Sequence, residues 1–295
     1  MFVADKPEQR GSLYVVATPI GHLGDLSARA LETLKTVNVI AAEDTRVTRG
    51  LLAHFGIGTR LIAVHEHNER DAAQGIVKLL DGGQSVALVS DAGTPGVSDP
   101  GALVVRAVRA AGFDVIPIPG ACALTAALSA SGMGEHGFSF AGFLPARNSE
   151  RAVRLKDLAA RREAIVFYEA PHRIEETVEA LRVAFGDAVP VLIAREVTKK
   201  FEQLHVAPLG EAATWLAADE NHRRGEFVIV VENSSTGAQI EDKSAQTQAL
   251  ERTLAILCEE LPLKQAVAIA VKLTGEKRNL VYERALALKN GRGEG

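Results

Sequence analysis

Short β-rich runs alternate with helical segments through the first 120 residues, and this alternation restricts the fold more than any other feature of the sequence. Asp25 or Ser27 is expected to cap the first helix, and Asp99 to cap a helix over 100–111 with Pro100 at its first position. Strands that alternate with helices build a mostly parallel sheet covered on both faces. The pattern predicts strands at 12–17, 37–42, 61–64, 85–90 and 114–117.

A segment rich in glycine, serine and alanine, 129–137, separates this part from a second α/β unit. We therefore expect an N-terminal α/β domain over 12–130 and a C-terminal α/β domain over 137–233. Residues 234–246 are polar and without periodicity, as in a linker, and 247–290 carry the leucine stripes of a helical extension with a helix-turn-helix-like pattern. In the second unit the pattern predicts strands at 138–143, 164–168, 189–195 and 226–231, and helices at 149–162, 173–185 and 211–218.

Composition and charge narrow the class of protein. The 295 residues include two cysteines, too few for a disulfide scaffold or a cysteine-cluster metal site. The charged first residues lack the apolar core of a signal peptide, and no apolar run reaches the about 18 residues of a membrane span, so we expect a cytoplasmic protein without membrane contact. The formal charge is −4, yet 261–292 contains seven basic and two acidic residues, and 147–162 is also basic. Such segments are most often solvated helix faces, but two of them on an acidic chain favour a polyanionic partner.

Polar and glycine-rich motifs follow the predicted strands: TPIG, EDTR, HEHNE and DAGTPGVSDPG. Because ligands of open parallel sheets bind beyond the carboxyl ends of the strands, we expect these motifs to share one rim. TPIGHLGD lacks the spacing of a phosphate loop, which argues against a nucleoside-triphosphate site. The segment 91–101 holds three glycines and two prolines and is longer than a plain turn requires, so we interpret it as a ligand-binding loop. PGACA at 119–123 is expected to present backbone amides at the start of a helix.

The two histidines of HEHNE could bind a metal, but hydrogen-bonding roles are favoured. His65 and His67 are two residues apart at a strand end, so their side chains are expected to point to opposite faces, unlike the ligands of a zinc helix. We therefore predict no metal. Cys122 is interpreted as a small buried residue and Trp215 as part of a core.

Eight motifs together resemble a known family. LYVVATPIGHLGD, AAEDTR, HEHNE, VSDAGTPGVSDPG, FAGFLP, FYEAPHR, AREVTKKFE and RRGEFVIVV occur in this order across residues 12–232. They closely resemble the small-subunit ribosomal RNA 2′-O-methyltransferases of the tetrapyrrole-methylase superfamily. The resemblance implies a two-domain tetrapyrrole-methylase-like α/β fold with S-adenosylmethionine bound between the domains, and a homodimer. It also implies a substrate, which is a cytidine ribose in the decoding region of 16S rRNA within the small ribosomal subunit.

The family's motifs also imply which residues line the cofactor site. The sequence departs from the family's pattern at His22, at Gly96-Val97 and at Ala121-Cys122, where an Asn, bulkier apolar residues and a Pro-Ser pair are common. From the second domain, Tyr168 or Glu169 and the strand start at 225–227 are implied to close the pocket. The implied cofactor-binding residues are Pro19, Gly21, Asp91, Gly93, Thr94, Ala121, Cys122, Tyr168 and Gly225.

Methyl transfer to a ribose hydroxyl requires alignment of donor and acceptor, and a group that takes the hydroxyl proton. A carboxylate or imidazole on the rim suits that role, and the sequence does not choose among Asp44, Glu66, His67 and Glu169. Phosphate contacts are predicted for basic residues near the rim, on one face of the helix at 149–162 and in the extension. These residues are Arg46, Arg173, Lys199, Arg147, Arg151, Lys277 and Arg278.

Two alternative functions fit parts of the sequence. One is a tetrapyrrole C-methyltransferase of the same superfamily, against which the basic segments, EAPHR and the helical extension argue. The other is a DNA-binding regulator that uses the extension, with Gly275 in its turn and basic residues toward phosphates. A regulator leaves the rim motifs of residues 18–101 without a role.

Overall fold

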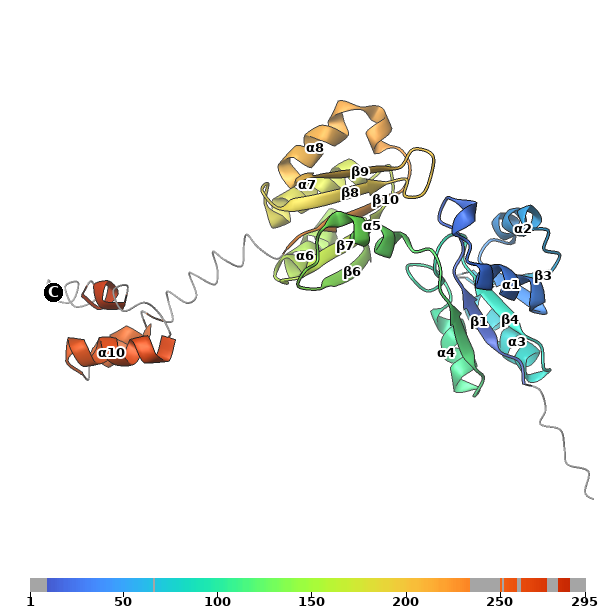
Figure 1. Ribbon diagram of the computed structural model, residues 1–295, viewed down its shortest axis with the longest axis horizontal. Coiled ribbons are helices and arrows are strands. Elements are labelled where there is room, and N and C mark those ends of the chain that lie inside the picture. The colour runs from blue at the N-terminus through green and yellow to red at the C-terminus, as the bar shows by residue number, and fades with distance from the viewer. Residues whose placement is uncertain are drawn as a thin grey trace, which may run out of the picture. The chain divides into compact units, whose positions relative to one another are not determined.

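The computed structural model describes residues 10–65, 67–233, 250, 252–258, 261–274 and 281–286. By its internal contacts the chain divides into two compact units, 1–233 and 234–295. Figure 1 shows the elements of each unit. Among the described residues, no helix has the length and apolar character needed to cross a membrane.

The first sheet of the larger unit is entirely parallel, with strand order β3-β2-β4-β1-β5. Every residue of the central strands β2 and β4 is buried, which explains their uninterrupted apolar sequences, VIAA and VALV. The predicted strands are confirmed, with ends shifted by one or two residues. The strands are β1 (Leu13–Val16), β2 (Val39–Ala42), β3 (Arg60–Ala63), β4 (Val86–Val89) and β5 (Val115–Ile118).

Helices cover both faces of this sheet. Two apolar clusters form, one with α1 (Ala28–Thr36) and α2 (Thr45–His54), and one with α3 (Glu69–Asp81) and α4 (Ala102–Ala110). Ser27 caps α1, because its hydroxyl accepts a hydrogen bond from the Ala30 amide at 3.1 Å, while Asp25 lies in the short helix η1 (Leu23–Asp25).

The predicted cap of α4 is wrong. The helix begins at Ala102 rather than at 100, and Asp99 makes no capping hydrogen bond to it. The cap comes instead from Glu69 of α3, whose carboxylate Oε1 accepts from the amides of Gly101 at 2.8 Å and Leu103 at 2.9 Å. A buried acid on a neighbouring helix thus satisfies the first amides of α4.

The second sheet is mixed, with order β6-β7-β10-β8-β9. β6 and β7 are parallel, and every other neighbouring pair is antiparallel. The sequence pattern missed β9, an edge strand with mostly exposed or partly exposed residues. The strands are β6 (Phe138–Phe143), β7 (Ala164–Glu169), β8 (Pro190–Arg195), β9 (Gln203–Pro208) and β10 (Phe227–Val231).

Helix α5 (Ala123–Ser131) packs on one face of this second sheet, where Leu124 and Ala127 join the apolar residues of β7, β8 and β10. Its residues fall within the expected N-terminal domain 12–130, yet they pack on the second sheet. The opposite face is covered by α6 (Asn148–Ala159), α7 (Ile174–Phe185) and α8 (Leu209–Ala218), followed by η2 (Glu220–Arg223). Trp215 packs against this core, as expected.

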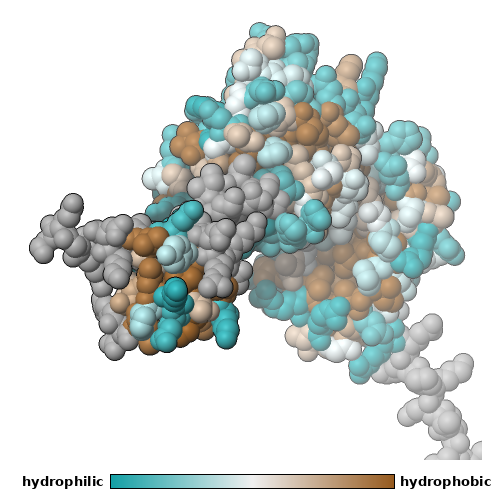
Figure 2. Space-filling model, turned by 60° about the vertical axis from the view of Figure 1, so that its left-hand side comes forward, coloured by the Kyte–Doolittle hydropathy of each residue, from teal (hydrophilic) through white to brown (hydrophobic). Residues whose placement is uncertain are grey.

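The second unit contains α10 (Leu263–Thr274), and residues 252–258 and 281–286 are also helical. Leu250 and Leu254 of the leucine stripes are buried in one cluster with Val267, Ala270, Val281 and Ala285. Figure 2 shows hydrophobic residues beside hydrophilic ones on its surface. The expected linker 234–246, Lys277 and Arg278 lie outside the described residues.

Candidate active site

A cavity of about 410 Å³ lies in the larger unit, within the size range of small-molecule sites. One wall follows the carboxyl ends of first-sheet strands: Ile20 after β1, Glu43 after β2, the loop 91–99 after β4 and Cys122 after β5. The other wall comes from one edge of the second sheet, where the ends of β6, β7 and β8 meet the start of β10. The loop 91–101 and PGACA therefore do reach a common site, but HEHNE contributes no lining residue among those described.

The loop after β4 is held in an unusual conformation. Gly93, Gly96 and Gly101 have φ of +82°, +81° and +135°, which glycine adopts readily. Ser98 has φ +65°, a conformation that costs free energy for a residue with a side chain. Backbone hydrogen bonds in both directions between Gly93 and Thr18, at 2.8 and 3.1 Å, tie the loop to the segment after β1.

Two of the implied cofactor residues join the loops after β4 and β5. The Thr94 hydroxyl donates to the carbonyl of Ala121 at 3.1 Å, so Ala121 supports the site without lining it. Asp91, Gly93 and Thr94 line the cavity directly.

Three acidic side chains gather at this wall. Glu43, Asp91 and Asp99 line the cavity, and the Asp91 amide donates to the Glu43 carboxylate at 3.3 Å. Burial raises the pKa of Glu43 above its usual value. Burial, together with the nearby charges of Glu43 and Asp91, raises the pKa of Asp99 to about 6, against a hydrogen bond with Ser90 that lowers it. The cavity therefore has a negative wall suited to a cationic ligand.

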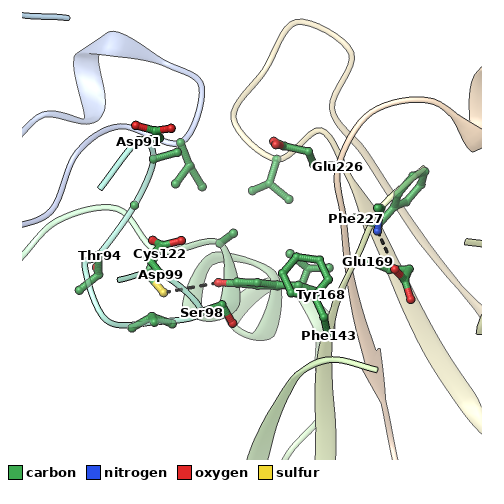
Figure 3. Close-up of a pocket in the computed structure, with 18 of the residues that line it drawn as sticks. Asp91, Thr94, Ser98, Asp99, Cys122, Phe143, Tyr168, Glu169, Glu226 and Phe227 are labelled. Carbon is green, nitrogen blue, oxygen red and sulfur yellow. Dashed lines mark hydrogen bonds between the residues drawn. The ribbon is translucent and has the colours of Figure 1, made fainter. Parts of the chain in front are cut away.

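Tyr168 at the end of β7 faces this wall (Figure 3). Its hydroxyl accepts from the Leu124 amide at 3.0 Å and lies 3.9 Å from the Cys122 sulfur. Burial, together with the neighbouring Cys122, raises the pKa of Tyr168, so its phenol stays protonated. Phe143 and Phe140 contact its ring edge-on, with centroids 5.9 and 4.8 Å away. Cys122 is only partly buried and lines the cavity, so the interpretation of it as a buried residue is wrong.

Gly21 and Gly225 allow close packing of protein segments beside the cavity. A Cβ on Gly21 would lie 2.5 Å from Lys199 Cγ, and the next amide, of His22, donates to the Thr198 hydroxyl at 3.2 Å. A Cβ on Gly225, which has φ +94°, would lie 2.5 Å from the Glu196 carboxylate. Neither glycine lines the cavity, but their neighbours Ile20 and Glu226–Val228 do. Pro19 is buried and does not line it.

The four residues considered for taking the hydroxyl proton occupy different environments. Asp44 caps α2 and pairs with Arg46, whose hydrogen bonds lower the pKa of Asp44 to about 2, and it does not line the cavity. Glu169 lines the cavity but is 2% exposed, and its oxygens accept from Thr177 at 2.6 Å and from the Ala170 amide at 2.8 Å. His67 is exposed and outside the lining, and Glu66 lies outside the described residues.

The expected divergence of the two histidines is wrong, because β3 ends at Ala63 and both follow it in a turn. The rings of His65 and His67 lie edge to face, 6.1 Å apart. Within the described parts of the chain, no group of three or more His, Cys, Asp or Glu residues is arranged to hold a metal ion.

The basic residues predicted to contact phosphate divide by exposure. Arg46 is 86% exposed and Arg147 is also exposed, paired with Asp44 and Glu150 respectively. Arg151 is 3% exposed and is held by Glu176 and Asn148. It therefore does not share an exposed face with Arg147, because this side of α6 packs toward α7.

Arg173 and Lys199 hold protein segments together. Arg173 donates to the Leu144 carbonyl at 2.7 Å and approaches Glu169 at 3.4 Å. Lys199 lines the cavity and pairs with Glu196 and Glu226. Burial lowers the pKa of Lys199, but the hydrogen bonds to these two carboxylates outweigh burial and raise it.

Sequence reasoning gave no site role to Glu43, and it placed Asp99 in the ligand-binding loop 91–101 but assigned its side chain to a helix cap. Glu43 stands beside Asp44 in EDTR, and its position directly after β2 was the available signal. Asp99 was assigned to a helix cap because Asp-Pro is a common helix start. No local signal distinguishes a cap from a cavity residue when the real cap, Glu69, lies thirty residues earlier.

Comparisons with known proteins agree with this architecture. The family model described as Tetrapyrrole (Corrin/Porphyrin) Methylases matches residues 12–213, and the model described as RsmI C-terminal HTH domain matches 244–289. Curated relatives named ribosomal RNA small subunit methyltransferase I include one from Escherichia coli O157:H7, 47% identical over 94% of this chain and 95% of its own length. One from Pseudomonas aeruginosa is 48% identical over 94% of this chain and 97% of its own.

Solved structures with the same fold are more distant in sequence. The methyltransferase CobJ has a TM-score of 0.58 at 23% identity, covering 77% of this chain and 95% of its own. Uroporphyrin-III C-methyl transferase from Thermus thermophilus, complexed with S-adenosyl homocysteine, has a TM-score of 0.54 at 20% identity, covering 76% and 98%. These likenesses establish the fold alone.

Proposed function

Because this chain belongs to the ribosomal RNA small subunit methyltransferase I family of the tetrapyrrole methylases, we propose that it methylates a cytidine ribose of 16S rRNA at the 2′-oxygen. The methyl donor is S-adenosylmethionine, and the target lies in the decoding region. The proposal of an RNA substrate rests on sequence identity to relatives named ribosomal RNA small subunit methyltransferase I, which extends over 94% of the chain. The motif resemblance adds the 2′-oxygen, the cytidine and the decoding region.

The cavity fits S-adenosylmethionine, which carries a positive sulfonium and a positive ammonium group. Glu43, Asp91 and Asp99 supply negative charge at one wall, and Gly93 lets the backbone approach a ligand closely. Apolar and aromatic residues complete the lining: Ile20, Val97, Phe143, Tyr168, Val197, Phe227 and Val228. Backbone amides at 121–123 stand at the start of α5.

When bound, S-adenosylmethionine supplies a methyl group already activated for in-line transfer. The protein's contribution is then alignment of donor and acceptor. The loop 93–99, held in place by the Thr18 and Ala121 contacts, provides a rigid floor. The aromatic side chains Tyr168 and Phe143 exclude water from the opposite side. The target nucleotide must leave its stack for its ribose to enter.

The remaining expectations about partners belong to the same proposal. We expect a homodimer that acts in the cytoplasm on the small ribosomal subunit, with Arg46 and Arg147 among the exposed phosphate contacts. A tetrapyrrole substrate is the weaker candidate, because uroporphyrin-III-C-methyltransferase from Thermus thermophilus and cobalt precorrin-4 methyltransferase are 22% and 15% identical to this chain, against 47% and 48% for the two relatives named for ribosomal RNA.

Radiolabelled S-adenosylmethionine incubated with the protein and unmodified small ribosomal subunits tests the proposal. We expect label in 16S rRNA, and 2′-O-methylcytidine on digestion and mass spectrometry. Naked 16S rRNA and uroporphyrinogen III serve as parallel substrates. Label in the tetrapyrrole and none in either RNA would overturn the assignment.

A further inference from the structure

A nucleotide that leaves its stack exposes the faces of the neighbouring bases. The proposed function requires this step, and the inference that follows rests on that proposed function. Proteins that bind single-stranded RNA cover such faces with aromatic side chains, and they place positive charge nearby for the phosphates. A ring in that role must be exposed, must be held beside the cavity, and must take no part in the protein's own core.

Phe201 is the aromatic side chain that meets the first and last of these conditions. It is 62% exposed, more than any other phenylalanine, tyrosine or tryptophan among the described residues. It belongs to none of the apolar clusters that those residues form. A single exposed apolar side chain is common on proteins, so the surroundings of this ring decide what it can bind.

The loop 196–202 places Phe201 beside the cavity. It joins β8 to β9 and reaches the segment after β1, where the Thr198 hydroxyl accepts from the His22 amide at 3.2 Å (Figure 1). Val197 and Lys199 of this loop line the cavity, whereas Phe201 does not. Two residues of chain span at most ~7 Å, which is about the length of two stacked nucleotides. The ring is therefore within reach of the nucleotide next to the one whose ribose enters the cavity.

Hydrogen bonds hold the backbone of the loop in place. The buried Arg195 donates from Nη1 to the Phe201 carbonyl at 2.9 Å. The Lys199 amide donates to the Glu196 carbonyl at 2.9 Å, and the Glu202 amide donates to the Lys199 carbonyl at 3.1 Å, so two successive turns are closed. A ring on a fixed backbone loses less conformational freedom when a ligand binds to it.

Positive charge stands beside the ring. The Lys200 ammonium lies 5.5 Å from the ring centroid of Phe201. Arg195 also donates from Nε to the Arg224 carbonyl at 2.6 Å, so one guanidinium holds the Phe201 and Arg224 segments together. The Arg224 side chain is 68% exposed and pairs with Glu220. An aromatic face with cations beside it favours RNA over a second copy of this chain.

We propose that Phe201 is a stacking platform for the nucleobase next to the methylated nucleotide, and that Lys200 contacts an adjoining phosphate. The base stacks on the exposed ring when the target nucleotide leaves its stack. Every base has such a face, so the contact strengthens RNA binding without selecting a sequence. Phe201 acts on substrate binding, while the methyl transfer itself takes place in the cavity.

Phe201→Ala in the full-length protein, assayed on unmodified small ribosomal subunits, tests the proposal. Loss of one base stack should raise the KM for subunits by about 5- to 150-fold, while kcat stays within about twofold. The affinity for S-adenosylmethionine, measured by calorimetry without RNA, should also stay within about twofold. Phe138→Ala is the matched control and should keep the wild-type KM, because Phe138 is an exposed phenylalanine at the end of β6 away from the cavity.

Two further substitutions at this position separate stacking from a simple apolar contact. Phe201→Tyr keeps an aromatic face and should retain the wild-type KM. Phe201→Leu keeps apolar bulk without that face and should behave like Phe201→Ala.

The salt dependence of RNA binding distinguishes the parts of Phe201 and Lys200. Stacking releases no counterions, so Phe201→Ala should weaken binding equally at every salt concentration. Lys200→Gln should reduce the slope of log affinity against log salt by about 0.7, the value for one phosphate of a single strand. A wild-type slope in Lys200→Gln would overturn the phosphate contact.

Four results with folded variants would overturn the stacking platform. A rise in KM below about fivefold for Phe201→Ala would mean that no base stacks there, and a wild-type KM for Phe201→Leu would mean a simple apolar contact. A large loss of cofactor affinity in Phe201→Ala would assign the ring to support of the cavity. A change in oligomeric state on sedimentation would assign it to contact with a second copy.

Phe201→Trp gives a readout that does not depend on methylation. A base stacked on the introduced indole quenches its fluorescence, so small subunits should quench this variant more than the wild type, whose Trp215 packs against the core. No added quenching, with a wild-type protein that methylates rRNA, would overturn the stacking alone. Failure of the proposed function is a different result, in which the wild-type protein itself leaves no 2′-O-methylcytidine in rRNA.

Discussion

Glu69 lies on α3 but caps α4, so its replacement by alanine removes the carboxylate that accepts hydrogen bonds from the first amides of α4. Glu69 is 8% exposed, and its Oε1 accepts from two backbone amides, those of Gly101 and Leu103. Without it, both amides at the start of α4 lose their acceptor in a buried place. The loop 91–101 ends at this point, so the substitution also acts on the cavity wall.

The size of the effect follows from these contacts. A hydrogen bond to a charged group contributes about 1.5–3 kcal/mol, and a negative charge at a helix N-terminus adds about 0.3–1 kcal/mol. Because the two bonds share one oxygen, we take the lower end of each range. Glu69→Ala should then lower the free energy of unfolding by about 3–4 kcal/mol. Glu69→Gln retains an acceptor oxygen and should lose less than half of that.

Urea denaturation of the cofactor-free protein, followed by circular dichroism, measures the change. Glu32→Ala on the exposed face of α1 is the matched control and should stay within about 0.5 kcal/mol of wild type. We also expect Glu69→Ala to weaken S-adenosylmethionine binding, because the loop loses its anchor. A loss of stability below about 1 kcal/mol would refute the assignment of Glu69 as the cap.

Four further outcomes are expected. Gly93→Val should abolish S-adenosylmethionine binding in a folded protein, because Gly93 has φ +82° and an added Cβ would lie 3.3 Å from Ile20 Cγ2; normal affinity by calorimetry would contradict this. Arg151→Ala should destabilise the protein by about 2 kcal/mol with little change in the salt dependence of RNA binding, because Arg151 is buried. Arg147→Ala, at an exposed position, should flatten that salt dependence. Equal salt slopes for the two variants would argue against a structural role for Arg151 and a phosphate contact for Arg147. The pKa of Asp99 is about 6 in the folded protein and about 3.9 in the unfolded chain, so ionisation of Asp99 destabilises the fold as the pH rises between these values. Asp99→Asn should therefore raise the free energy of unfolding at pH 7.5 by about 1 kcal/mol, after allowance for half-exposure, and leave it unchanged at pH 3.5. Thermal melting at both pH values measures the difference. Truncation after Ser234 should leave a folded protein that binds S-adenosylmethionine but has a higher KM for rRNA; loss of cofactor binding would assign the extension a structural role instead.

Local pattern was sufficient to locate the strands and the rim of the first sheet. The central strands β2 and β4 are short apolar runs, and each is followed directly by polar residues that reach the cavity or support it. Burial on both faces demands an apolar run, and strand ends demand polar turns, so these signals stand within a few neighbouring residues. The edge strand β9 lacks such a run, because most of its side chains are exposed, and it was missed for that reason.

Contacts between distant segments decided the roles of individual side chains. Asp99 directly precedes the predicted helix at 100–111, and Asp44 directly precedes α2. Asp44 caps its helix, whereas Asp99 lines the cavity, because Glu69 of another helix caps α4. Arg151 belongs to a basic helix by sequence, but it is buried against α7, where it forms an ion pair with Glu176. Sequence periodicity determines which segments become strands and helices, because it acts through neighbouring residues. The partner of a charged side chain is set by packing of elements far apart in the chain, and only the tertiary structure contains that information.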